Sequence, residues 1–152
     1  LNTTPVRQVN LQSLAGGTNI GNTVNVIFSR DGRKLYHLAE DIGVISQFSM
    51  STPFDITTLT YDAKTLSFSP NSATACAITT TGNQFYISAD NDDFIEYSLS
   101  TPFDISTATA TGTEYALTEM DVPSKYNFSN DMTKLFASRY TGAIHEFEVT
   151  LG

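Results

Sequence analysis

One stretch of the chain occurs twice: Ser51-Thr52-Pro53-Phe54-Asp55-Ile56-Thr57-Thr58 and, 49 residues later, Ser100-Thr101-Pro102-Phe103-Asp104-Ile105-Ser106-Thr107. The first six residues of the two copies are identical. A weaker copy, Thr3-Thr4-Pro5-Val6, lies 48 residues before the first. Repetition at a fixed spacing is the signature of a repeat architecture. We therefore interpret residues 1–152 as a single repeat domain, with repeats at approximately 4–51, 52–100 and 101–150.

Two further blocks repeat in the same order, and they show the strand pattern. The first block occupies residues 28–36, 78–86 and 128–136, and the second occupies residues 45–50, 94–99 and 144–149. Apolar residues alternate with polar ones, as in Val24, Val26 and Phe28, which predicts strands with one buried face. Turn residues such as Asp31-Gly32 separate the strands. Each copy therefore predicts four strands, the last near residues 58–62 in the first copy and 107–111 in the second.

Composition excludes several classes of protein. Hydrophobic residues make up 40% of the chain and charged residues only 16%, so the chain is neither disordered nor a coiled coil. The net charge of −8 argues against nucleic acid as a partner. The single cysteine, Cys76, excludes an internal disulfide, and no apolar run is long enough for membrane insertion. The chain begins at Leu1 without a methionine, so we expect that the native start was processed or lies elsewhere.

A single repeat is too small to fold alone. Its recurring apolar side chains number roughly five or six, each worth about 2 kcal/mol when buried. Ordering about 49 residues costs far more than that. The sheets must therefore pack on one another, as they do in repeat arrays.

The run Phe-Ser-x-Asp-Gly-x-Lys-Leu-Tyr at residues 28–36, followed by Ile-x-x-Phe-Ser at residues 45–49, resembles the blades of WD-repeat and YVTN-type β-propellers. The stretch Leu-Ser-Thr-Pro-Phe-Asp-Ile-Ser-Thr at residues 99–107 resembles a repeat of phage, marine bacterial and other surface or virion proteins. The resemblance implies an all-β fold of three four-stranded antiparallel propeller-type blades.

The number of repeats leaves alternatives open. Propellers typically close with four to eight blades, so three blades do not complete a ring. Either several chains build a larger ring, or the sequence is part of a longer polypeptide. The alternative fold is a β-trefoil, which has three four-stranded units in about 150 residues and closes as a monomer. A stable monomer in solution would favour the trefoil.

Candidate binding residues lie in the loops that differ most between copies, because function is usually carried by loops on a repeated frame. They follow the second strand of each copy and are Glu40, Asp41, Asp90, Asp92, Asp93, Arg139 and Tyr140. Tyr140 offers a ring for stacking on a sugar. Asp90, Asp92 and Asp93 offer oxygen ligands for Ca²⁺, although the full twelve-residue calcium loop is missing, so we expect a solvated turn and no cofactor. His37, His145 and Cys76 occupy ordinary strand positions.

No Walker loop, serine elbow or paired-carboxylate motif occurs. The sequence therefore predicts a non-enzymatic structural or interaction module, located on a virion or outside the cell. Its expected partners are further copies of itself or other virion or surface proteins. The alternative is a lectin-like module that binds glycan through the variable loops. An enzyme is the third hypothesis, because propellers can carry hydrolases whose residues form no linear motif.

Overall fold

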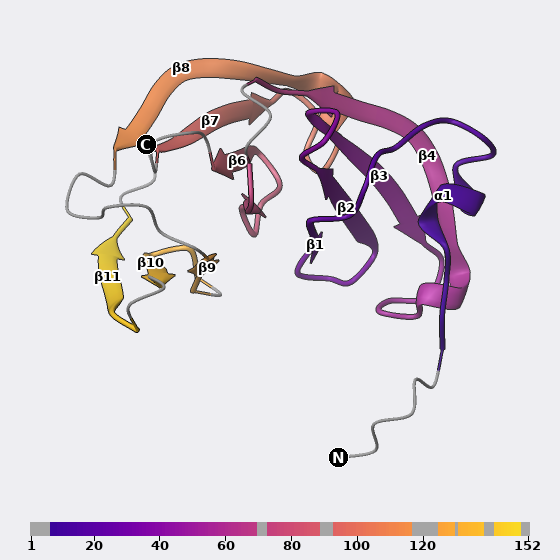
Figure 1. Cartoon of the computed structure of the whole chain (residues 1–152), viewed down its shortest axis with the longest axis horizontal. Coiled ribbons are helices and arrows are strands. Elements are labelled where there is room, and N and C mark those ends of the chain that lie inside the picture. Colours follow the sequence, from indigo (N-terminus) through magenta and orange to yellow (C-terminus); the bar gives the residue numbers. More distant parts are fainter. Residues whose placement is uncertain are drawn as a thin grey trace.

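Three antiparallel sheets follow one another along the chain (Figure 1). The computed structural model describes residues 7–69, 73–88, 93–116, 125–129, 131–138 and 142–149. The first sheet contains β1 (Asn25–Phe28), β2 (Lys34–Ala39), β3 (Val44–Met50) and β4 (Leu59–Ser67). The second contains β5 (Cys76–Ile78), β6 (Gln84–Ser88), β7 (Asp93–Leu99) and β8 (Ala108–Ala116). The third contains β9 (Lys125–Phe128), β10 (Lys134–Ser138) and β11 (Ile144–Glu148).

The strands pair in sequence order in every sheet, and equivalent residues face each other. Leu35 pairs with Phe48 in the first sheet, as Phe85 pairs with Tyr97 in the second. This meander is the arrangement of a propeller blade, and it differs from the trefoil alternative. We call the three sheets the first, second and third blade.

Two details differ from the sequence-based expectation. The third blade has three strands in the described part of the chain, where four were expected. The outer strands are also longer than expected, since β4 and β8 extend to Ser67 and Ala116. A bulge allows this length: the register of β4 shifts between Gln47 and Phe48 of β3, and Ala63 at the bulge has a positive φ of 54°.

Two connecting segments, residues 51–58 and 100–107, carry the chain from the third to the fourth strand. Asp55 and Asp104 each cap a short 3-10 turn, Ile56–Thr58 and Ile105–Thr107, by accepting a backbone N–H. Phe54 and Phe103 precede these caps and have φ values of 58° and 63°. Such values are uncommon outside glycine, so tertiary contacts must hold both residues in place.

The contact that holds each phenylalanine is a glycine of the preceding hairpin turn. The N–H of Phe103 donates to the carbonyl of Gly82 at 3.0 Å, and its ring lies where a Cβ on Gly82 would stand. Phe54 and Gly32 make the same contact. The Asp-Gly turn and the Pro-Phe-Asp segment, separate in sequence, are thus two halves of one structural unit.

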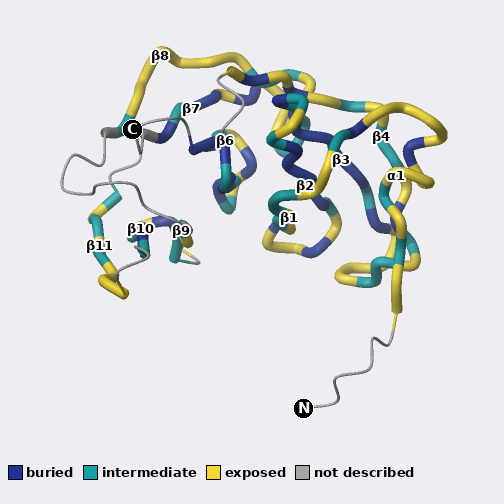
Figure 2. Tube along the Cα trace, viewed as in Figure 1, coloured by how far each residue is buried: buried dark blue, intermediate teal, exposed yellow. Residues whose placement is uncertain are grey.

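The first two blades share the largest core among the described residues. Figure 2 shows buried residues along β2, β3, β6 and β7. Tyr36, Leu38 and Ile45 of the first blade pack against Phe85, Ile87 and Tyr97 of the second. The rings of Tyr36 and Phe85 meet edge to face, 5.4 Å apart. A second core, including Tyr86, Phe94 and Leu135, joins the second and third blades. The side chains of one blade therefore alternate between its two neighbours.

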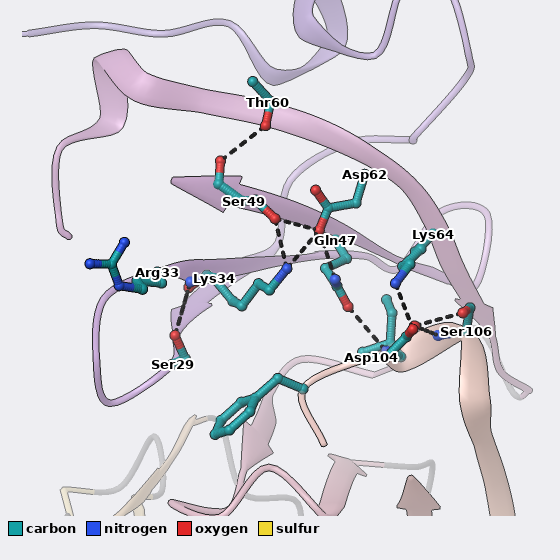
Figure 3. Close-up of polar contacts among 12 residues, drawn as sticks. Ser29, Arg33, Lys34, Gln47, Ser49, Thr60, Asp62, Lys64, Asp104 and Ser106 are labelled. Carbon is teal, nitrogen blue, oxygen red and sulfur yellow. Dashed lines mark hydrogen bonds and ion pairs between the residues drawn. The ribbon is translucent and has the colours of Figure 1, made fainter. Parts of the chain in front are cut away.

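Polar contacts lock the second connecting segment onto the first blade (Figure 3). Tyr36 donates its hydroxyl to the carbonyl of Phe103 at 3.0 Å, and the N–H of Ile105 donates to Gln47 Oε1 at 3.0 Å. Lys64 Nζ lies 2.5 Å from Asp104 Oδ2. Gln47 is itself held by Asp62, which accepts from its Nε2. We call these contacts the blade junction.

The opposite face of the first blade is covered by the segment that precedes β1. This segment contains α1 (Leu11–Leu14). Ala15 and Ile20 are buried against Leu35, Phe48 and Met50 of the first blade. We call residues 11–20 the cover segment. No helix among the described residues has the length and hydropathy needed to cross a bilayer.

Candidate functional site

A pocket of about 740 Å³ lies on the innermost strands of all three blades. Among the described strands, β1, β5 and β9 each pair with one neighbour, and residues of all three line the pocket. Its polar lining residues are Asn25, Ser29, Arg30, Thr79, Thr80, Asn127 and Ser129. Its apolar lining includes Val26, Ile27, Phe28, Phe54, Tyr126 and Met132. This volume and this mixture of polar and apolar groups suit a small molecule.

Two polar groups in the pocket lining lack a polar partner among the described residues. Asn25 Oδ1 makes no hydrogen bond with them, and it is shielded from solvent, so a ligand reaches it only if the side chain rotates. Arg30 is exposed and makes no ion pair with the described residues. Arg30 is the one charged residue in the lining, so the described part of the pocket has a positive charge and no carboxylate. The pocket therefore favours a ligand that is neutral and hydrogen-bonding, or anionic.

Two of the hydroxyls in the lining, those of Ser29 and Ser129, make their hydrogen bonds within hairpin turns. Ser29 Oγ donates to Asp31 Oδ1 at 2.6 Å and accepts the N–H of Lys34 at 2.9 Å. Ser129 makes the same pair of contacts in the third blade. The hydroxyl of Ser29 lowers the pKa of Asp31, with help from the N–H of Arg33. The hydroxyl of Ser29 thus makes its hydrogen bonds within its own turn, and it is not placed as a nucleophile.

Cys76 also lines the pocket, and its environment makes the thiol unreactive. It is buried, and burial raises its pKa to about 12. The thiolate, which is the nucleophilic form, is therefore scarce at neutral pH. This agrees with the expectation that Cys76 is structural.

The structure gives Asp41 a structural role. Its two carboxylate oxygens accept the backbone N–H and the Nδ2 of Asn22, both at 2.9 Å. Asp41 thereby fixes the chain just after the cover segment to the hairpin between β2 and β3. Glu40 lies in the same hairpin turn, where its carbonyl accepts the N–H of Gly43. Neither residue lines the pocket.

The other predicted binding residues are not brought into a described site. Asp90, Asp92, Arg139 and Tyr140 lie outside the described residues, and Asp93 is the first residue of β7 with its side chain outside them. Within the described ranges, no three His, Cys, Asp or Glu side chains are grouped as for a metal ion. His37 is buried in β2, and desolvation lowers its pKa despite the opposing charge of Asp41.

Sequence reasoning missed the pocket residues because it searched the variable loops. Asn25 interrupts the apolar run from Val24 to Phe28, and this polar residue in an inner strand was the available signal. Arg30 stands at a turn position that holds Thr80 and Asn130 in the other copies. Both signals are weak without the knowledge that inner strands from three blades meet at one pocket.

No family model matches the chain, and no curated protein matches it by sequence. Solved structures do match its fold. A proposed 6-phosphogluconolactonase from Bacteroides fragilis superposes with a TM-score of 0.59 at 18% identity, covering 82% of this chain and 34% of that one. The periplasmic gluconolactonase of Pseudomonas aeruginosa gives 0.55 at 16% identity, with coverage of 82% and 34%.

Propellers with other names match similarly. The β-propeller domain of Myceliophteria thermophila Swd1 gives a TM-score of 0.51 at 13% identity, covering 81% of this chain and 38% of that one. Sqt1 from Chaetomium thermophilum, bound to the N-terminus of the ribosomal protein L10, gives 0.53 at 14%, covering 82% and 32%. The chain therefore has a β-propeller-type fold, and it spans about a third of the length of these structures. The predicted all-β propeller blades are confirmed.

The comparisons correct the predicted function. The sequence predicted a non-enzymatic module, with a lectin-like module as the alternative, because no linear catalytic motif occurs. Proteins named as gluconolactonases have the same arrangement of blades, and this overturns that prediction. The absence of a linear motif was a poor guide, because residues lining a pocket between blades come from distant parts of the chain. The predicted virion or extracellular location stays a prediction. So does the expectation of no cofactor, with Ca²⁺ at Asp90, Asp92 and Asp93 as the alternative.

Proposed function

We propose that the pocket on β1, β5 and β9 binds a sugar lactone and that the chain takes part in its hydrolysis. The observation that carries this proposal is the pocket itself, which combines a free arginine with an unpartnered amide oxygen. The names of two propellers of similar fold, a proposed 6-phosphogluconolactonase and a gluconolactonase, supply the substrate class to test.

The groups in the pocket suit such a substrate. Hydrolysis adds water to the lactone carbonyl carbon, breaks the ring C–O bond and transfers a proton to the leaving oxygen, which gives a hydroxy acid. Negative charge develops on the carbonyl oxygen during attack, and a guanidinium stabilises such charge. Arg30 fills this role, or holds a phosphate where the sugar carries one. Asn25 Oδ1, which is shielded from solvent, accepts a hydrogen bond from a sugar hydroxyl once its side chain rotates toward the pocket.

The test is lactone hydrolysis by the full chain, with glucono-δ-lactone and 6-phosphogluconolactone as substrates. Acid release is followed in a pH-stat and corrected for spontaneous hydrolysis. We expect Arg30→Ala to lower kcat/KM by about a hundredfold, and Asn25→Ala to raise KM. Arg33→Ala is the matched control, because Arg33 is also exposed but lies outside the pocket lining. Hydrolysis no faster than the spontaneous rate with both lactones would contradict the proposal.

Self-association is a separate proposal about partners. Propellers of similar fold include Sqt1 bound to a protein segment, which supports contact with a protein partner in general. Light scattering across a range of concentrations tests the predicted homo-oligomer. A mass of 16.6 kDa at every concentration would contradict it.

A further inference from the structure

The blade junction has an equivalent on the second blade. Tyr86 and Glu96 pair across β6 and β7, as Tyr36 and Gln47 pair across β2 and β3. Tyr36 and Gln47 bind the second connecting segment, residues 100–107, by its Phe103 carbonyl and its Ile105 N–H. The second blade therefore presents a tyrosine and a glutamate, at the two equivalent positions, to its own neighbour.

At the second blade these groups lack the partner that they have at the first. Tyr86 is 2% exposed, and its buried hydroxyl has no hydrogen-bond partner among the described residues. Glu96 is 8% exposed and accepts the hydroxyl of Tyr115 at 2.6 Å and Gln84 Nε2 at 3.4 Å. A carboxylate has about four acceptor sites, so Glu96 retains room for a backbone N–H.

The described part of the third blade lacks the outer strand that the first two blades have. Its described part ends with β11, which pairs with β10 on one side and with no described strand on the other. In the first two blades, the equivalent strands β3 and β7 pair with an outer strand that directly follows the connecting segment. A segment that fills the site at Tyr86 is therefore followed by a strand placed to pair with β11.

We propose that Tyr86 and Glu96 form a docking site for a peptide segment of the type Thr-Pro-Phe-Asx-Ile-Ser/Thr-Thr, whose following strand completes the third blade along β11. The carbonyl of its phenylalanine accepts the Tyr86 hydroxyl, and the N–H of its isoleucine donates to Glu96. The occupant is thus identified by chemistry: a hydrogen-bonding backbone, an aromatic residue and a β-strand.

The charges at the site of Tyr36 and Gln47 differ from those at the site of Tyr86 and Glu96. This difference specifies one residue of the segment that we expect at the second site. At the first site the aspartate of the connecting segment, Asp104, meets Lys64. The position of Lys64 is held by Thr113 in β8, and the neutral Gln47 is replaced by Glu96. An aspartate in the incoming segment would meet a carboxylate without a cation. The second site therefore prefers asparagine there, which still accepts the N–H that caps the 3-10 turn.

The test is a titration of the full chain with labelled peptides, followed by fluorescence anisotropy. The probe is the 17-residue sequence of residues 100–116, which contains a connecting segment and its outer strand. We expect saturable binding, and we expect the peptide with Asp104→Asn to bind about threefold more tightly. A scrambled peptide of the same composition serves as the negative control.

Protein variants test the two contacts separately. Tyr86→Phe removes only the hydroxyl and should weaken peptide binding about fivefold, whereas Tyr36→Phe should leave it unchanged because that hydroxyl is already occupied. Glu96→Gln should abolish the preference for the asparagine peptide. Absence of binding, equal binding of the scrambled peptide, or full affinity in Tyr86→Phe would overturn the proposal. Displacement of the peptide by a second copy of the chain would also overturn it.

Discussion

The hydroxyl of Tyr36 donates to the carbonyl of Phe103, 67 residues further along the chain, over 3.0 Å. The equivalent tyrosine, Tyr86, is also buried, but its hydroxyl makes no hydrogen bond within the described part of the chain. One repeated residue thus occurs in a satisfied and an unsatisfied state within the same molecule. Comparing the two isolates the contribution of the hydrogen bond to stability.

Tyr36→Phe should lower the free energy of unfolding by about 1–2 kcal/mol, because it leaves the Phe103 carbonyl without its donor. Tyr86→Phe should leave that free energy unchanged or raise it slightly, because it removes a buried hydroxyl that makes no hydrogen bond with the described residues. Urea unfolding followed by circular dichroism measures both. Equal losses in the two variants would show that the junction bond contributes nothing specific.

Gly82→Ala should destabilise the chain by about 3 kcal/mol. Gly82 has a φ of 74°, and a Cβ there would stand 2.6 Å from the ring of Phe103. Gly112→Ala is the matched control, because Gly112 has a φ of 79° but open space around it. It should cost about 1 kcal/mol, the backbone strain alone. Similar losses in thermal unfolding would mean that contact with Phe103 is unimportant.

Acid should weaken the blade junction through Asp104. Burial raises the pKa of this carboxyl, but hydrogen bonds from Lys64 and Ser106 outweigh it, so the pKa lies below its ordinary value of 3.8. A carboxyl with a lowered pKa in the folded state stabilises the protein above the unfolded-state pKa, and this stabilisation is lost as the pH falls through the folded-state pKa.

The unfolding free energy should therefore fall between about pH 5 and pH 2, and Asp104→Asn should reduce that fall. Asparagine preserves the turn cap and removes only the titrating charge. Urea unfolding at several pH values measures the difference. An identical pH dependence in the variant would show that the Lys64 contact does not survive in solution.

Asp41→Ala should release the cover segment. Without the two hydrogen bonds to Asn22, amide hydrogen exchange should accelerate near Ile20, while the cores between blades stay protected. Glu40→Ala is the control, since that side chain makes no hydrogen bond with a described residue. Unchanged exchange in Asp41→Ala would mean that apolar packing alone holds the segment.

The repeat predicted the blades because period-two alternation and turn residues are local properties of the sequence. Pro53 and Pro102 lie between the third and fourth strands, where the lack of a backbone N–H breaks no ladder. The left-handed backbone of Phe54 and Phe103 was beyond such reasoning, because phenylalanine disfavours it. Only contact with Gly32 and Gly82, which belong to another block of the repeat, makes that conformation stable.

The candidate site was harder to predict for the same reason. Asp41 was predicted to bind a ligand because it is acidic and lies in a variable loop, and this stays a prediction. The structure shows that its carboxylate accepts hydrogen bonds from Asn22 of the same chain. The loop sequence also varies between copies because the loop of the first copy contacts the segment that precedes β1. Conversely, Asn25 and Arg30 face a common pocket only after three blades are placed side by side, and that placement depends on contacts between distant residues.

The cover segment makes the two outer faces of the stack of blades different. Ala15 and Ile20 occupy the face of the first blade that, in the second blade, receives a neighbour. Another blade approaching from that side must first displace them, whereas the far side of the third blade presents Ile144 at 74% exposure. Closure of a ring through that face of the first blade would therefore require the cover segment to leave it.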